Sequence, residues 1–500
     1  MSHLAIAPIL LPLIAGILLL LFRGVDLRLR RAFSLAAVLG QIGLALLLLD
    51  RVGDGRIVVY ALGDWPAPYG IVLVADRLAA WMLIITAALA LFPLWAACRG
   101  LDRAGRHFHV LYQWQLMGLN GAFLTGDLFN LFVFFEVLLL ASYGLMLHGG
   151  GQLRTRAGLH YVVLNLAGSS LFLIAVGTLY GLFGTLNMAH LALKLAAVTP
   201  QDLGPARAAG LLLFGVFALK AALLPLHLWL PAAYTQTSAP VAALFAIMTK
   251  VGVYAILRAA TLLFGDQAGA LAQLLAPWLL PLALATLVIG LLGALAARSL
   301  GEQAAYLVAA SVGTLLTAFA LGSAEALAAG LYYLPHSVFA GAALFLLAEQ
   351  IARARGGLGD RFEPGPVMAG APALGALFFL AAVLAAGLPP LSGFLGKFLL
   401  LKAALAHPAW PWILAVVLAG GLLGLIALAR SGSLLFLRPG PETPPAGVPT
   451  LAALAPLIGL LALAVGLAVL AGPIQALTRA TADQLLQPYH YVHAVLGGQP

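Results

Sequence analysis

The chain consists largely of apolar runs that are each long enough to cross a lipid bilayer. About 20 consecutive apolar residues span the hydrocarbon core as a helix, and such segments follow one another from residue 4 to residue 472. Charged residues make up only 9% of the 500 residues, whereas a soluble domain usually has about 25%. The runs are too long for the alternating segments of about ten residues that build outer-membrane barrels. The sequence therefore predicts an all-α polytopic membrane protein.

Pro, Gly and charged clusters divide the apolar sequence into about fourteen expected transmembrane helices. The segment at 370–406 is too long for one straight span, and Gly387-Leu388-Pro389-Pro390 is expected to break it. The tail 473–500 is expected to be a short amphipathic or irregular segment, and Gly440–Pro449 a Pro-rich linker. The expected helices lie near 4–22, 32–50, 71–98, 108–126, 128–148, 159–184, 208–230, 238–264, 271–297, 303–322, 325–352, 370–406, 410–437 and 450–472.

The basic residues of the connections predict the orientation of the chain. Odd-numbered connections hold about fifteen Lys and Arg and even-numbered ones about six, so the odd connections are expected in the cytoplasm. The first run, Leu4–Phe22, has no basic region before it and is followed by arginines, so it is expected to be a retained span. We therefore expect a bacterial inner-membrane protein with a periplasmic N-terminus. The net charge of +9 is dispersed over the loops and does not indicate a nucleic-acid partner.

Two segments, Lys220–Pro240 and Gly387–Lys402, are interrupted by proline at comparable places in the two halves of the chain. Proline frees backbone carbonyls, which inside a membrane must be satisfied by protein or water. Paired interruptions of this kind are typical of inverted repeats in transporters. We therefore predict N-terminal helices at 1–107, a first five-helix repeat at 108–264, a second at 265–437, and a linker, last helix and tail at 438–500.

Charged side chains inside the apolar runs are the main functional signal, because a charge at the bilayer centre costs about 2.5–3.5 kcal/mol on insertion scales. Glu136 lies several residues from either end of its run and has no polar neighbour three or four residues away. Lys220, close to the break at Pro225, is its expected partner. A movable Glu–Lys pair is suited to loading and ejecting a proton. A structural ion pair or a snorkelling lysine are the alternatives.

Three further ionisable residues extend this series along the chain. Lys250 lies about twelve residues into its run, too deep to reach the interface easily, and is a candidate proton relay. His336 is a candidate relay as well, although a single His in a span is often only a hydrogen-bonded packing residue. Lys397 follows the second proline break as Lys220 precedes the first, so it is the expected terminal proton site.

Weaker candidates lie near helix ends. His227, close to the first break, is a secondary member of the network. Arg258 is a second one, although like Lys402 and Glu349 it is expected to snorkel to the interface. Glu349 and Arg353 are spaced as an ordinary surface ion pair. In addition, Asp127 and Asn130 are expected to cap the fifth span.

The sequence contains no motif for a cofactor. It has no Gly-x-x-x-x-Gly-Lys-Ser/Thr loop, no Gly-x-Gly-x-x-Gly and no metal-binding Cys-x-x-Cys or His-x-x-x-His pattern. The single cysteine, Cys98, excludes an intrachain disulfide and argues against a cysteine-ligated metal centre. We therefore expect no cofactor and no metal, and a transporter that is driven by an ion gradient or a partner protein.

At four stretches the chain resembles the antiporter-like subunits shared by respiratory complex I, membrane hydrogenases and Mrp-type multisubunit sodium/proton antiporters. Within that superfamily it is most similar to the D-type subunits of Mrp antiporters, through Trp65–Arg77, Asn120–Asp127, Gly184–Met188 and a length near 500 residues. The four stretches are Asp127–Tyr143, Leu219–Pro231, Met248–Tyr254 and Gly387–Phe398.

The resemblance implies about fourteen helices, two inverted five-helix repeats and a complex with subunits of the A, B, C, E, F and G types. Such a complex is expected to exchange external protons for cytoplasmic sodium. The resemblance also implies a proton route through Glu136, Lys220, Lys250, His336 and Lys397.

Two positions depart from the family pattern. Gly341 stands where a second basic residue is expected five residues after the histidine, and Ala232 replaces a charged residue after Trp-Leu-Pro. The central relay is therefore expected to use water. Two other functions remain open: a proton-pumping subunit of complex I or a hydrogenase, and a purely structural membrane scaffold.

Overall fold

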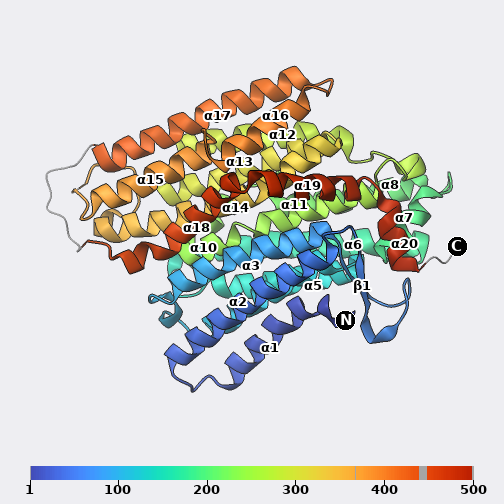
Figure 1. The fold of residues 1–500 in the computed structure, drawn as a ribbon, viewed down its shortest axis with the longest axis horizontal. Helices are drawn as coiled ribbons and strands as arrows, with labels where there is room; N and C mark the ends of the chain where they lie inside the picture. Colours follow the sequence, from blue (N-terminus) through green and yellow to red (C-terminus); the bar gives the residue numbers. More distant parts are fainter. Residues whose placement is uncertain (1, 366, 438–447, 498–500) are drawn as a thin grey trace.

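The computed structural model describes residues 2–365, 367–437 and 448–497 as a helical bundle with one small hairpin (Figure 1). In its first half lie α1 (Ala7–Leu21), α2 (Leu27–Val52), α3 (Arg77–Ala97), α4 (Phe108–Leu124), α5 (Leu128–Met146), α6 (Gln152–Phe183), α7 (Met188–Ala196), α8 (Leu203–Ala221), α9 (Trp229–Gln236), α10 (Ala239–Phe245) and α11 (Met248–Arg258). In the second half lie α12 (Ala276–Ala296), α13 (Leu300–Ala320), α14 (Ala324–Arg355), α15 (Ala371–Ala386), α16 (Ser392–Ala404), α17 (Trp410–Gly432), α18 (Leu451–Val469), α19 (Ala471–Leu485) and α20 (Pro488–Leu496).

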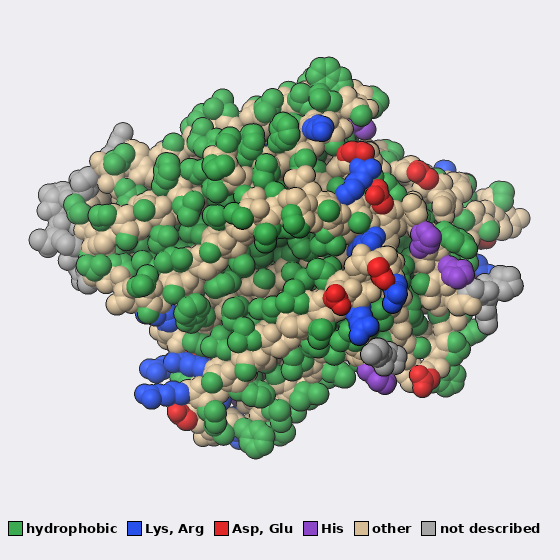
Figure 2. Space-filling view, viewed as in Figure 1, with side chains coloured by type: hydrophobic (Ala, Val, Ile, Leu, Met, Phe, Trp, Pro, Cys, Tyr) green, Lys and Arg blue, Asp and Glu red, His purple; other side chains and the backbone are tan. Residues whose placement is uncertain are grey.

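The long helices run roughly along one common axis, and α14 lies at their centre (Figure 1). It packs against α10, α13, α15, α16, α18 and α19, and its most apolar stretch is entirely buried. Hydrophobic side chains cover the middle of the visible face, whereas charged ones gather towards the two ends (Figure 2). This distribution is that of a bundle that crosses a bilayer along its long axis.

The prediction of an all-helical, multi-pass membrane protein is confirmed. Among the described residues, eleven helical segments are long and apolar enough to cross a membrane. The remaining predicted segments contain the shorter helices α1 and α4 and the pair α15–α16. Each predicted segment thus holds a helix, while the count of fourteen spans stays a prediction.

Both predicted interruptions are present. Helix α8 ends at Ala221, and the next residue, Ala222, takes a left-handed backbone conformation with φ of 58°. Helix α15 ends at Ala386, where Gly387 takes φ of 78°. In each case the chain turns for several residues before a second, shorter helix begins. The Pro-rich linker predicted at Gly440–Pro449 lies, apart from its last two residues, outside the described part of the chain.

The helix expected at 71–98 begins later than predicted. Residues Val72–Ala75 form strand β2, which pairs antiparallel with β1 (Val58–Ala61). The alternating β-branched residues favour a strand here, and the Asp76 side chain then accepts the backbone N–H of Ala79 and caps α3. The tail is helical, as α19 and α20, rather than irregular.

Candidate functional site

Glu136 and Lys220 do not form a direct ion pair; each bonds a residue of α6. The Ser169 hydroxyl donates a hydrogen bond to the Glu136 carboxylate and also contacts the Asn165 backbone oxygen at 3.0 Å. The Lys220 ammonium donates to the Asn165 side-chain and backbone oxygens at 3.3 and 3.5 Å. Four side chains from α5, α6 and α8 therefore form one polar cluster inside an apolar surrounding.

Local helix geometry explains how this cluster is built. Asn165 and Ser169 are four residues apart and therefore share one face of α6. Lys220 occupies the last turn of α8, next to the break, and is only 8% exposed. Gly252 of α11 permits a close approach here, because a Cβ at that position would overlap the Ala221 backbone nitrogen.

Lys250 is fully buried in α11 and donates to the Ser311 hydroxyl of α13 at 2.9 Å. Ser311 also lines a small cavity together with His336 and Lys397. No carboxylate lies among the described residues that line this cavity. The ammonium group is therefore held by a neutral hydroxyl, an arrangement that suits a group which alternates between charged and neutral forms.

His336 is 1% exposed, and its Nδ1 lies 3.1 Å from the Ser392 hydroxyl. The Ser392 hydroxyl donates its single proton to the Ala464 carbonyl at 2.8 Å. Nδ1 therefore carries a proton and donates it to Ser392, and in the neutral ring Nε2 is then the acceptor nitrogen. Gly393 makes room for the ring, since a Cβ there would lie 2.8 Å from Nε2.

Lys397 uses the second helix break. Its ammonium donates to the Ala386 carbonyl at 2.8 Å, one of the carbonyls that the end of α15 leaves without a helical partner. The cavity that it shares with Ser311 and His336 has a volume of about 40 Å³, which is room for about three water molecules. Gly341 also lines this cavity. The position where a basic side chain was expected therefore borders a space that can hold water.

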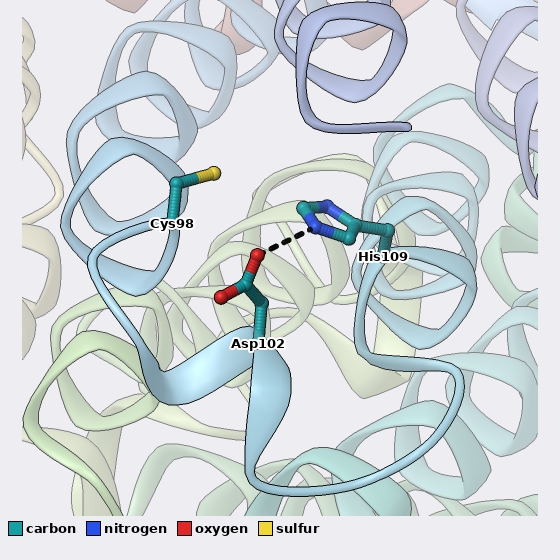
Figure 3. Close-up of side chains that lie close together, drawn as sticks. All are labelled: Cys98, Asp102 and His109. Atoms are coloured by element: carbon teal, nitrogen blue, oxygen red, sulfur yellow. Dashed lines mark hydrogen bonds and ion pairs between the residues drawn. The ribbon is translucent and has the colours of Figure 1, made fainter. Parts of the chain in front are cut away.

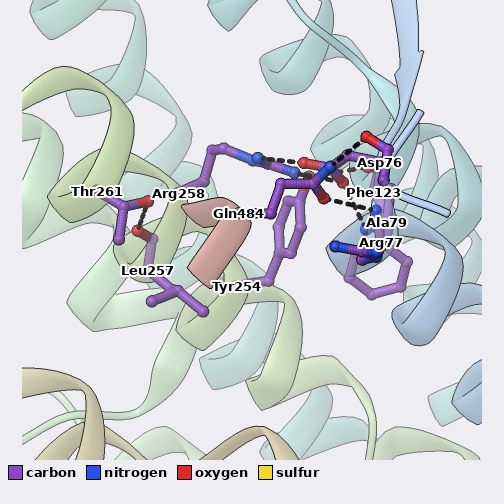
Figure 4. Close-up of polar contacts among 10 residues, drawn as sticks. Asp76, Arg77, Ala79, Phe123, Tyr254, Leu257, Arg258, Thr261 and Gln484 are labelled. Carbon is purple, nitrogen blue, oxygen red and sulfur yellow. Dashed lines mark hydrogen bonds and ion pairs between the residues drawn. The ribbon is translucent and has the colours of Figure 1, made fainter. Parts of the chain in front are cut away.

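The expectation that Arg258 snorkels is wrong. Arg258 is 6% exposed and forms a two-pronged ion pair with Asp76, with Nη1–Oδ2 at 2.6 Å and Nη2–Oδ1 at 3.0 Å (Figure 4). Tyr254 and Tyr491 lie beside the guanidinium, whose carbon is 5.5 and 5.2 Å from their ring centres. The carboxylate at the start of α3 satisfies the charge locally, so the side chain has no need to reach the interface.

The remaining candidate residues differ in how far they are buried and in which groups they contact. His227 is buried in the turn between α8 and α9, and its Nδ1 has no hydrogen-bond partner in the described part of the chain. Lys402 is exposed. Glu349 pairs with Arg353 at 2.6 Å, as predicted. The Asp127 side chain accepts the Asn130 backbone N–H and caps α5, whereas Asn130 donates to Thr125 and is not itself the cap.

Sequence reasoning missed the neutral members of the site. Asn165 and Ser169 are polar residues four apart in an apolar run, a spacing that could have indicated a shared buried face. Ser392 follows the Pro-Pro break. The charged partner of Arg258, Asp76, was also missed, although with Arg77 it precedes an apolar run. Ser311 carries no such signal, because small polar residues are common in membrane helices.

Known proteins similar to this chain include subunits of membrane antiporters. A family model described as "NADH:quinone oxidoreductase/Mrp antiporter, TM" matches residues 125–423. The chain is 42% identical to the D-type subunit of a probable K⁺/H⁺ antiporter of Rhizobium meliloti, over 99% of this chain and 98% of the relative. It is 38% identical to the D-type subunit of a Na⁺/H⁺ antiporter of Alkalihalophilus pseudofirmus, over 99% and 100%.

The fold is also similar to that of a solved assembly. A chain in the structure of the Mrp complex from a Dietzia species superposes with a TM-score of 0.89. The two chains are 30% identical, and the similarity covers 99% of each. The likeness thus extends over the whole chain, including the hairpin and the C-terminal helices.

Proposed function

The chain belongs to the NADH:quinone oxidoreductase/Mrp antiporter transmembrane family, and from this membership we infer that it is the D-type subunit of a multisubunit monovalent cation/proton antiporter. It is a multi-pass membrane protein and a transporter subunit rather than a catalytic enzyme. Its partners are the other subunits of such a complex, of the A, B, C, E, F and G types. The family model alone does not separate antiporters from complex I, but full-length relatives named as D-type antiporter subunits favour the antiporter.

The observation that carries the proposal is the polar cluster of Glu136 and Lys220 beside a broken helix. Here Lys220 is held by Asn165 and Glu136 by Ser169, so the two charges are parted. A change of side-chain rotamer brings the ammonium to the carboxylate, and a second change parts them again. The proton affinity of the pair therefore depends on the distance between the ammonium and the carboxylate.

The second half of the route runs through the small cavity that Ser311, His336 and Lys397 line. Lys250 reaches it through Ser311, while His336 and Lys397 line it directly. Water in this cavity connects the three groups and replaces the basic side chain that is absent at Gly341. We propose that the two broken helices belong to two repeats, at 108–264 and 265–437, each of which contributes one half of the route.

Cation exchange by the whole complex tests the proposed function. Everted vesicles from a host without its own antiporters, carrying the full complex, are expected to lose an imposed pH gradient when Na⁺ is added. Because one relative is named for K⁺, KCl is added in a parallel assay. A response to K⁺ alone contradicts the sodium prediction. No response to either cation contradicts the antiporter function.

The alternative function, a proton-pumping subunit of a complex I-type oxidoreductase or a hydrogenase, uses the same buried residues. Co-purification separates the two, because the antiporter brings down small hydrophobic antiporter subunits. Recovery of quinone-reductase or hydrogenase subunits instead establishes the alternative.

Replacing Ser169 by alanine is expected to slow cation-driven proton exchange by about tenfold. The change removes a hydrogen bond to a charged group, which contributes about 1.5–3 kcal/mol. The initial rate of pH-gradient loss in vesicles measures it. Ser170→Ala is the matched control, because Ser170 is exposed on the same helix and its hydroxyl donates to the Leu166 carbonyl of its own helix. Equal rates for the two variants contradict a role for Ser169.

We propose an inner-membrane location with the N-terminus on the periplasmic side, and cysteine labelling tests the orientation. In a Cys98→Ala background, Tyr69→Cys is expected to react with an impermeant maleimide in intact spheroplasts, since Tyr69 is 89% exposed beyond β1. Arg103→Cys, in the connection between α3 and α4, is expected to react only after lysis. The reverse pattern contradicts the positive-inside assignment.

A further inference from the structure

A strongly basic cavity opens at the end of the bundle where α1 turns into α2, close to the 3₁₀ turn Leu101–Arg103. Its volume is about 640 Å³. Lys and Arg side chains visibly gather at this end of the molecule (Figure 2). The charged and imidazole side chains that line the cavity are Arg23, Arg30, Arg103, Arg106, His107, His109 and Asp102.

The single carboxylate in this lining does not neutralise the arginines. Asp102 is already paired with Arg31, which is not part of the lining, through Nε–Oδ2 at 2.5 Å and Nη2–Oδ1 at 2.7 Å. Burial alone raises the pKa of the Asp102 carboxyl, but the bonds and charges of Arg31 and His109 outweigh it and hold that pKa below its usual range. The four lining arginines therefore remain uncompensated within the cavity.

Asp102 also lies beside Cys98 and His109, and the possible ligand atoms of the three are within 4.8 Å of one another (Figure 3). This group is not a convincing metal site, because Arg31 occupies both carboxylate oxygens and supplies the positive charge that a metal would bring. His109 is 5% exposed, and its Nδ1 has no partner among the described residues, as is true of Arg30 Nε. Two buried polar atoms of the lining are thus unsatisfied, which indicates a missing hydrogen-bonding group.

An apolar groove continues from the basic cavity. It has a volume of about 300 Å³, and apart from Arg30 its lining is entirely apolar: Leu18, Leu19, Phe22, Val25, Leu29 and Phe33. The two hollows share Leu19 and Arg30, so they are adjacent. Phe22 and Leu29 are about 60% exposed, so the groove opens outward along α1 and α2.

We propose that this composite site binds an anionic phospholipid, with the phosphate in the arginine-lined cavity and one acyl chain in the apolar groove. Arginine is well suited to phosphate, because its planar fork matches two oxygens at once. A free phosphate leaves the groove empty, and a neutral lipid leaves the arginines uncompensated. Only a ligand with a negative head and an apolar tail satisfies both halves of the site. Basic pockets beside membrane helices on the cytoplasmic side recognise lipids in this way.

The experiment uses the full complex in phosphatidylcholine vesicles that contain a photoactivatable phosphatidylglycerol. After illumination, mass spectrometry maps the crosslinked peptides. Labelling is expected on the residues that line the groove, and it is expected to fall by about fivefold for each arginine removed. Arg103→Gln/Arg106→Gln is the safest variant, because both residues are exposed. Arg30→Gln is the second variant.

Arg28→Gln is the matched control, because Arg28 lies two residues from Arg30 on α2 but outside both linings. It is expected to keep wild-type labelling. Loss of labelling in this control, or full labelling in both test variants, overturns the proposal. Labelling that millimolar inorganic phosphate abolishes identifies a free-phosphate site instead. Absence of labelling in the wild-type complex means that another subunit covers the site, and this also overturns it.

Discussion

Replacing Glu136 by glutamine is expected to reduce cation-driven proton exchange to the level of vesicles that lack the complex. Glu136 is the only acidic residue of α5, and in the proposed mechanism its carboxylate is the group that Lys220 approaches and leaves. The amide keeps the size of the side chain and can still accept the Ser169 hydrogen bond, but it cannot take up a proton. Loss of an imposed pH gradient on addition of Na⁺ or K⁺ measures the effect.

The control for this variant is Glu349→Gln, which removes a carboxylate at the end of α14 that is paired with Arg353. Its exchange rate is expected to stay near that of the wild type, because surface pairs of this kind contribute at most about 1 kcal/mol. Protein amounts of both variants must match the wild type. Wild-type exchange by Glu136→Gln at normal protein levels would falsify the proton-site assignment.

Replacing Asp76 by asparagine is expected to destabilise the protein by about 3–5 kcal/mol, because it leaves the Arg258 charge buried without its partner. Asparagine is also a good helix cap, so the bond to the Ala79 N–H is preserved and the effect isolates the lost charge. The amount of folded protein and its thermal unfolding, followed by size-exclusion chromatography after heating, measure the change.

A second substitution tests whether the lost ion pair is the cause of the destabilisation. Asp76→Asn/Arg258→Met removes both charges, so no buried charge is left without a partner. The double variant is therefore expected to recover most of the lost stability. If the single variant is as stable as the wild type, the ion pair does not contribute as the geometry indicates. If the double variant is less stable than the single one, Arg258 has another partner.

The membrane architecture is predictable because it depends on properties that are local in sequence. Apolar length fixes each helix, and prolines and glycines fix the two breaks. The hairpin escapes prediction because the residues at 71–98 are apolar on both sides of Asp76 and Arg77. Hydropathy does not distinguish the four residues of β2, which pair with β1, from the helix that follows Asp76.

The charged residues of the site are also predictable, since a charge in an apolar run stands out, but their partners are not. The sequence predicts that Glu136 and Lys220 bond each other, whereas each bonds a neutral residue of α6. It places Arg258 at the interface because its distance from the helix end is visible in the sequence, while its pairing with Asp76 across 182 positions is not. Partner choice depends on helix packing, and a single sequence does not reveal it.

The position of the last helix has a consequence for how the chain is made. Tyr491 of α20 packs over Arg258, and Gln484 of α19 bonds the Arg77 backbone N–H and the Gly55 carbonyl. These contacts link the C-terminal helices to residues that were synthesised hundreds of positions earlier. The first helices are therefore inserted before α20 can pack over the Asp76–Arg258 pair. A nascent chain that stops before α20 lacks Tyr491 and therefore leaves the Arg258 guanidinium partly uncovered.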